Sequence, residues 1–136
     1  MATRVLLRLA ALTGEARYRA AGERALPTVT PYLARYPTGF ANWLSAAALS
    51  VHGIVELAIV GDPDDPATQA LLAEAQQGEP PNLVVALIAD PNASAIPLLH
   101  DRTRTGGRPT AFVCRDFACR EPVTTPEALA AQLQSR

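Results

Sequence analysis

The chain has 136 residues, of which 49% are apolar and 18% charged, a composition that excludes a disordered protein and predicts a soluble globular fold. Its 12 basic and 13 acidic side chains give a net charge of −1, so we expect neither nucleic acid nor an anionic membrane as a partner. Arg8 interrupts the apolar N-terminal run, and no signal peptide or membrane span is predicted there. Without an export signal, we expect a cytoplasmic protein whose two cysteines stay reduced.

Residues 1–53 are predicted to form a helical segment. Thr13-Gly14 ends the first helix, in which apolar residues recur at helical spacing: Val5, Leu6, Leu9 and Leu12. A second helix, about residues 15–26, should end at Pro27.

Two further helical stretches are expected before Gly53. Thr28 or Thr30 can cap a short helix that has Pro31 in its first turn. The next helix should start at an N-cap on Thr38 and stop at Gly53. Along one side this helix carries Phe40, Trp43, Leu44, Ala47 and Val51.

Residues 54–136 are predicted to form an α/β domain, because the hydrophobic period changes after Gly53. Short apolar runs predict buried strands at 54–61, 82–90 and 109–114, and a fourth strand is expected at 118–124. The residues 115–118 between the cysteines suit a hairpin loop. Helices are expected after Asp65-Pro66 and Thr125-Pro126, since each pair combines an N-cap with a proline in the first turn.

This order, βαβ followed by ββα, predicts a thioredoxin-like half-sheet, with a Rossmann- or flavodoxin-like sheet as the alternative. Arg108-Pro109-Thr110 is similar to the proline turn of the thioredoxin fold. A redox-active thioredoxin has C-x-x-C at the start of its first helix. Residues 61–66 of this chain read GDPDDP, so that nucleophile is missing.

Four stretches together resemble one family: residues 12–26, 36–49, 56–63 and 107–133. They are similar to the C-terminal end of the spermatogenesis-associated, thioredoxin-domain-containing (YyaL-like) proteins. The last stretch is the most specific, because it combines a Pro-Thr strand, a C-x4-C hairpin and a helix started by proline. The resemblance covers nearly all of this chain, but only a small final part of such a protein.

The resemblance implies a large parent with a thioredoxin-like domain, then an (α/α) toroid similar to those of N-acylglucosamine 2-epimerases and six-hairpin glycosidases, then this region. Residues 1–53 would be the last toroid helices and residues 54–136 a thioredoxin-like cap. Implied partners are the upstream toroid and thioredoxin-like domains or a second copy of the chain, and carbohydrate metabolism is the implied setting. Because helices without their toroid neighbours would expose an apolar face, we expect dimerisation through residues 1–52.

Cys114 and Cys119 form a C-x4-C pair with three possible roles. Structural zinc needs four ligands, and the other soft ligands, His52 and His100, are far away in sequence. A redox-active disulfide is possible if the two cysteines face each other across a hairpin. Two buried thiols packed as small hydrophobic residues are the reading that we favour.

Three other candidate sites each have a structural alternative. Tyr36, Phe40, Asn42 and Trp43 can line a sugar-sized cavity in a complete toroid, or simply pack in a core. Arginines in the loop after His100 can bind an anion, or lie solvated at the surface: Arg102, Arg104 and Arg108. The aspartates after the first strand can bind a hard metal ion, but helix capping explains them more simply: Asp62, Asp64 and Asp65.

We therefore expect a non-catalytic structural or interaction module that has no catalytic residues, metal or cofactor of its own. Two alternatives stay open. In the first, the chain forms part of the cavity wall of an epimerase- or glycosidase-like toroid enzyme. In the second, Cys114 and Cys119 give it a thiol redox role.

Overall fold

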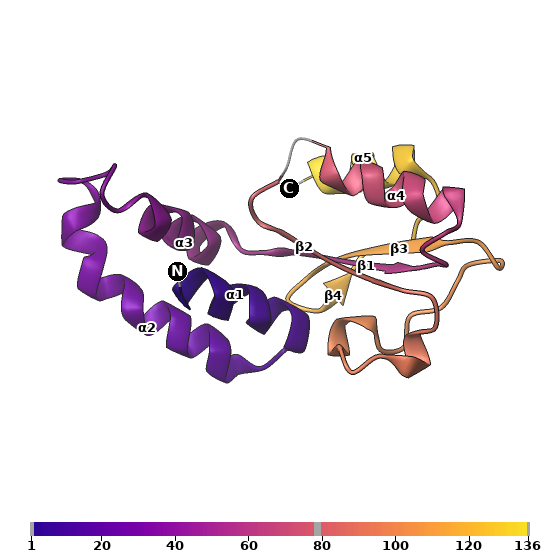
Figure 1. Cartoon of the computed structure of the whole chain (residues 1–136), viewed down its shortest axis with the longest axis horizontal. Coiled ribbons are helices and arrows are strands. Elements are labelled where there is room, and N and C mark those ends of the chain that lie inside the picture. Colours follow the sequence, from indigo (N-terminus) through magenta and orange to yellow (C-terminus); the bar gives the residue numbers. More distant parts are fainter. Residues whose placement is uncertain (1, 78–79, 136) are drawn as a thin grey trace.

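The computed structural model describes residues 2–77 and 80–135, and it shows three helices beside a four-stranded sheet (Figure 1). The helices of the N-terminal segment are α1 (Ala2–Thr13), α2 (Ala16–Leu33) and α3 (Ala41–His52). The remaining elements are β1 (Val55–Val60), α4 (Pro66–Gln76), β2 (Leu83–Ile88), the 3₁₀ turns η1 (Pro91–Ala93) and η2 (Pro97–Leu99), β3 (Thr110–Arg115), β4 (Ala118–Cys119) and α5 (Pro126–Gln134). The chain thus has the mixed α/β architecture predicted from its sequence.

The strands lie in the order β2-β1-β3-β4. β1 and β2 are parallel, whereas β1 and β3, and β3 and β4, are antiparallel. This is the arrangement expected of βαβ followed by ββα. The fourth strand is shorter than predicted, because only Ala118 and Cys119 continue the ladder. The ladder then breaks, and Val123 pairs with Ala111 of β3 in an isolated antiparallel bridge.

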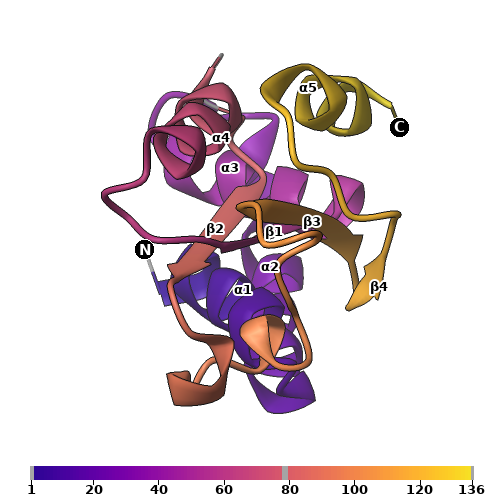
Figure 2. The ribbon, with the colours of Figure 1, turned by 90° about the vertical axis from the view of Figure 1, so that its right-hand side faces the viewer.

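Each face of the sheet packs against helices, as Figure 2 shows with α4 and α5 on one side and α1 on the other. The side under α4 and α5 carries a core of Val55, Leu57, Ile59, Leu71, Ala75, Ala111, Val113 and Leu129. The opposite side packs against η2 and Leu12 of α1, and its core consists of Ala58, Val60, Ala86, Leu98, Leu99, Phe112 and Cys114. Alternate residues of β1 therefore enter two separate cores.

The caps of α4 and α5 are those predicted from the sequence. The Asp65 carboxylate accepts a hydrogen bond of 2.8 Å from the amide of Ala67, and Pro66 follows in the first turn. The Thr125 hydroxyl accepts a bond from the amide of Ala128 in the same way. Local sequence signals are enough to predict where these two helices begin, because a capping side chain acts within one turn of its own helix.

The helical segment differs from prediction at two places. α2 continues through Pro27 and Pro31 to Leu33, so the predicted stop at Pro27 is wrong. Thr28 and Thr30 are not caps, because their hydroxyls donate to carbonyl oxygens of the preceding turn. α2 packs against both α1 and α3, and this tertiary packing offsets the low helix propensity of proline. α3 begins at Ala41 rather than near Thr38.

Candidate functional site

Cys114 and Cys119 are joined by a disulfide bond. They are direct partners across the β3–β4 ladder, and their Cα atoms lie 3.9 Å apart. Directly opposed residues of antiparallel strands project to the same face, which brings the two sulfurs together. The expectation of two reduced thiols is therefore wrong for this structure, and a redox role for the pair stays a prediction.

A buried glutamate, Glu56 of β1, lies in the same row of the sheet. It is the direct partner of Cys114 in β3, so Glu56, Cys114 and Cys119 follow one another across three strands. Only 1% of Glu56 is exposed, and its Oε2 accepts a hydrogen bond of 2.9 Å from the amide of Phe117. The sequence prediction missed this residue. The available signal was a single charged residue inside an apolar strand.

Burial raises the pKa of Glu56 above its ordinary value near 4.5, because the carboxylate loses its hydration. The hydrogen bond from the Phe117 amide opposes this rise, the nearby Asp116 carboxylate adds to it, and the Arg19 guanidinium opposes it again. The neutral form of Glu56 thus persists to higher pH than that of an exposed glutamate.

Replacing Glu56 by glutamine should stabilise the fold at pH 8 relative to wild type, and this gain should shrink as the pH falls. Because the pKa is raised in the folded state, the stability contributed by Glu56 is fully present below the unfolded-state pKa and is lost as the pH rises through the folded-state pKa. Glutamine keeps an oxygen for the Phe117 amide but never ionises. Urea unfolding of both proteins between about pH 4 and pH 8 measures the difference. A difference that does not change with pH, or one matched by exposed Glu121→Gln, would contradict this expectation.

The tip of the β3–β4 hairpin connects the sheet to the helical segment. Asp116 and Phe117 form a two-residue turn in which both φ angles are positive, at 48° and 63°. The Asp116 carboxylate pairs with Arg19 of α2 at 2.6 Å. The Phe117 ring lies so close to Gly14 that a Cβ at that glycine would be 3.2 Å from the ring. The predicted loop of residues 115–118 is thus only two residues long, and it contacts the junction between α1 and α2.

Arg102 contacts the disulfide from the loop before β3. Its Nη2 lies 2.9 Å from Sγ of Cys119, and its guanidinium stacks over the ring of Phe112 at 5.3 Å from the ring centroid. Within the described part of the chain, its buried Nε has no hydrogen-bond partner. A guanidinium in this position favours negative charge on the Cys119 sulfur.

The other two arginines of the predicted anion site lie elsewhere. Arg104 donates to the carbonyl oxygen of Ala89 at 3.4 Å. Arg108 is exposed, and its backbone pairs with that of Thr105 in an isolated bridge that closes a tight turn. The structure therefore does not gather Arg102, Arg104 and Arg108 around one point, and of the three only Arg102 contacts the disulfide.

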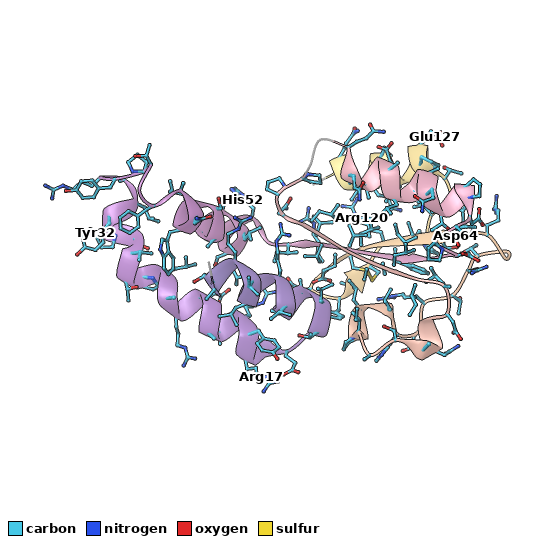
Figure 3. The ribbon with its side chains drawn as sticks, viewed as in Figure 1. Arg17, Tyr32, His52, Asp64, Arg120 and Glu127 are labelled. Carbon is cyan, nitrogen blue, oxygen red and sulfur yellow. A yellow bond between two sulfur atoms is a disulfide. The ribbon has the colours of Figure 1, made fainter. Side chains whose placement is uncertain are left out.

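The predicted sugar-binding residues lie at the connection between α2 and α3. Figure 3 shows Tyr32, near this connection, at the end of the helical segment remote from the sheet. Phe40 stacks on Tyr32 with ring centroids 6.0 Å apart, while Tyr36 is half exposed under Arg35. Asn42 accepts a long hydrogen bond from Arg4, and Trp43 is half-buried. Tyr36, Phe40, Asn42 and Trp43 line no part of the groove described next.

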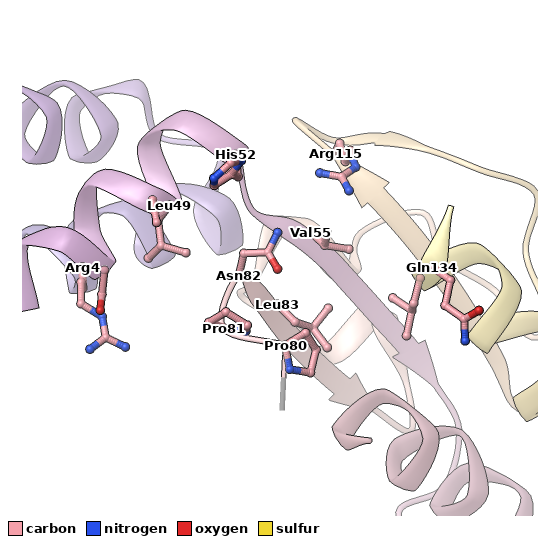
Figure 4. A pocket seen from close by; sticks show the side chains of 13 residues that line it. Arg4, Leu49, His52, Val55, Pro80, Pro81, Asn82, Leu83, Arg115 and Gln134 are labelled. Atoms are coloured by element: carbon pink, nitrogen blue, oxygen red, sulfur yellow. The ribbon is translucent and has the colours of Figure 1, made fainter. Parts of the chain in front are cut away.

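A groove of about 800 Å³ opens between α3, the start of β2 and the end of α5 (Figure 4). Its lining is Arg4, Ser45, Ala48, Leu49, His52, Val55, Pro80, Pro81, Asn82, Leu83, Arg115, Leu133 and Gln134. Carboxylates are lacking among these described residues. No sequence pattern predicted this groove, because its walls come from distant parts of the chain.

The aspartates after β1 act as local caps. The Asp62 carboxylate accepts from the amide of Asp64 at 3.0 Å, and Asp65 caps α4 as described. Over residues 2–77 and 80–135, no three His, Cys, Asp or Glu side chains are grouped in a way that could hold a metal ion.

Apolar side chains on the outer side of α3 are exposed. Ala41, Leu44, Ala48 and Val51 all face solvent, and Val51 is 79% exposed. We call these four residues the α3 stripe. The residues that α3 buries are instead Ala46 and Leu49. Leu44 and Val51, two of the apolar residues expected along one side of this helix, are thus exposed, as are Val5 and Leu9 of α1.

Comparison with protein-family models, with curated proteins and with solved structures gave no match for this chain. The resemblance noted from the sequence therefore stays a prediction. Among the helices described, none is both long and apolar enough to cross a membrane.

Proposed function

We propose that this chain is a non-catalytic interaction module that binds a helical partner through the α3 stripe. The spacing of the stripe carries this proposal. Its four members, Ala41, Leu44, Ala48 and Val51, follow at intervals of three, four and three residues. That spacing places apolar side chains along one seam of a helix, as in left-handed helix packing.

The composition of α3 supports the same conclusion. Residues 41–52 contain no Asp, Glu, Lys or Arg, whereas the solvent side of a surface helix normally carries charge. Burying an exposed aliphatic side chain contributes about 1.5 to 3 kcal/mol. Covering Val51, which is 79% exposed, would contribute most of this amount, and covering Leu44, which is 39% exposed, would contribute less. The two alanines allow a neighbouring helix to approach closely.

The groove next to α3 extends this surface toward the sheet. Ala48 belongs both to the α3 stripe and to the groove wall, and Ser45, Leu49 and His52 complete the contribution of α3 to that wall. A helix lying on the stripe can therefore insert side chains into the groove. In the family that the sequence resembles, the partner would be a helix of the α/α toroid. When no toroid is present, a second copy of the chain offers its own α3 stripe as the partner surface.

The double substitution Leu44→Glu/Val51→Glu tests this proposal. We expect wild-type protein to self-associate at micromolar concentrations in sedimentation velocity experiments, and the variant to associate at least about tenfold more weakly, because each glutamate puts charge into an apolar contact. The fold should persist, since both side chains already face solvent in the monomer.

Ala70→Glu is the matched control, because Ala70 is an exposed alanine on α4, away from the α3 stripe. It adds the same type of charge and should leave association unchanged. A wild-type chain that stays monomeric at the highest soluble concentration, or equal weakening by both variants, would refute the proposal.

A further inference from the structure

We propose that Cys114–Cys119 is a reversible thiol–disulfide exchange site, at which an external thiolate attacks the Cys119 sulfur and Cys114 is the leaving group. This inference is independent of the docking role proposed for α3. It depends on the order of Glu56, Cys114 and Cys119 across the sheet and on the contact of Arg102 with Cys119.

The two sulfurs differ in access. Cys114 is 1% exposed and belongs to the core between the sheet and α1. Cys119 is half-buried and ends β4, the outermost strand of the sheet. Thiol–disulfide exchange requires the attacking thiolate to approach along the line of the sulfur–sulfur bond, so access decides which sulfur is attacked. Attack at Cys119 is therefore favoured over attack at Cys114.

Arg102 makes the Cys119 end of the disulfide electropositive. Its Nη2 contacts Sγ, and its position is fixed by stacking on Phe112. An arginine here attracts an anionic thiolate reagent and, after complete reduction, stabilises a Cys119 thiolate. This favours both the attack and the second exchange step, in which Cys119 itself leaves.

Glu56 is placed to protonate the leaving Cys114. The two residues are direct cross-strand partners, whose Cβ atoms in such pairs lie about 4.5 to 5.5 Å apart. Because Glu56 is buried, two negative charges at this position would be strongly disfavoured. A proton carried by Glu56 neutralises the Cys114 thiolate as it forms, and the carboxylate then regains a proton from solvent.

A monothiol such as glutathione supplies the two electrons that reduce the protein disulfide. The first thiolate forms a bond to the Cys119 sulfur, the Cys114–Cys119 bond breaks, and Cys114 takes up a proton. A second thiolate attacks the reagent sulfur of this mixed disulfide and releases Cys119. Two thiolates are oxidised to one disulfide, and the protein disulfide takes up two electrons. Cys114 becomes a thiol with the proton of Glu56, and Cys119 leaves as the thiolate that Arg102 stabilises.

The single variants Cys114→Ala and Cys119→Ala separate the roles of the two sulfurs. Each is treated with oxidised glutathione, and adduct formation is followed by mass spectrometry. We expect the remaining Cys119 to react at least about tenfold faster than the remaining Cys114. Adding Arg102→Gln to Cys114→Ala should slow the reaction of Cys119, whereas Arg104→Gln, which alters the same loop without touching the sulfur, should not.

In the wild-type chain, the attacked sulfur can be identified without any substitution that could alter the fold. A brief reaction with reduced glutathione is quenched with acid, and the adduct is located after digestion with trypsin, which cleaves at Arg115 and separates the two cysteines. Glutathione on Cys119 supports the inference. Glutathione mainly on Cys114, equal reactivity of the two single variants, or reaction only after unfolding in urea would overturn it.

Discussion

Replacing Phe117 by alanine should lower the free energy of unfolding by about 2 to 3 kcal/mol. The ring packs against Gly14 and contributes to the core on the α1 side of the sheet. Alanine loses these contacts but keeps the backbone amide that donates to Glu56. Urea unfolding measures the loss, and hydrogen exchange should show faster opening of the α1–α2 junction.

Phe40→Ala is the matched control for this substitution. Phe40 is also half-buried, but it stacks on Tyr32 away from the sheet. The Phe40→Ala substitution should destabilise the protein without selectively increasing hydrogen exchange at the α1–α2 junction near Gly14. If both variants gave the same pattern of hydrogen exchange, the hairpin tip would not be what connects the sheet to the helices.

Removing the disulfide with Cys114→Ala/Cys119→Ala should cost about 2 kcal/mol, the value that loop-closure entropy gives for a ring this small. Alanine is chosen because a serine hydroxyl at the buried position of Cys114 would need a hydrogen-bond partner. Thermal unfolding of wild type and variant, with and without a strong reductant, measures the effect.

Reductant should lower the melting temperature of wild type to near that of the double variant, and it should leave the double variant unchanged. The variant provides its own control, because any effect of reductant on it cannot come from the disulfide. A wild-type protein whose melting temperature does not respond to reductant would contradict the predicted contribution of the bond.

The elements set by local signals were predictable from sequence. Asp65-Pro66 and Thr125-Pro126 start α4 and α5 as expected, because capping and the fixed φ of proline act within a single turn. The strand order also follows from the alternation of short apolar runs with helical periods. The prolines inside α2 misled the prediction, since the tertiary packing of α2 against α1 and α3 outweighed their low helix propensity.

The candidate sites were less predictable, because they depend on pairings between distant residues. Nothing local in the sequence places Glu56 beside Cys114, 58 positions later, or Arg102 against Cys119. The apolar periodicity of α3 predicts an apolar side of the helix but not what covers it, and Leu44 and Val51 are exposed. An apolar stripe is the same sequence signal whether it covers a core or meets a partner.

The turn at Asp116-Phe117 has a consequence for how this hairpin tolerates redesign. Asn-Gly would suit the two positive φ angles better than an aspartate and a phenylalanine do. Yet a glycine has no ring for Gly14, and an asparagine has no charge for Arg19. A hairpin improved in isolation would therefore lose both of these contacts, and the helical segment would be held to the sheet only by the packing of α1 against η2 and β2 among the contacts described.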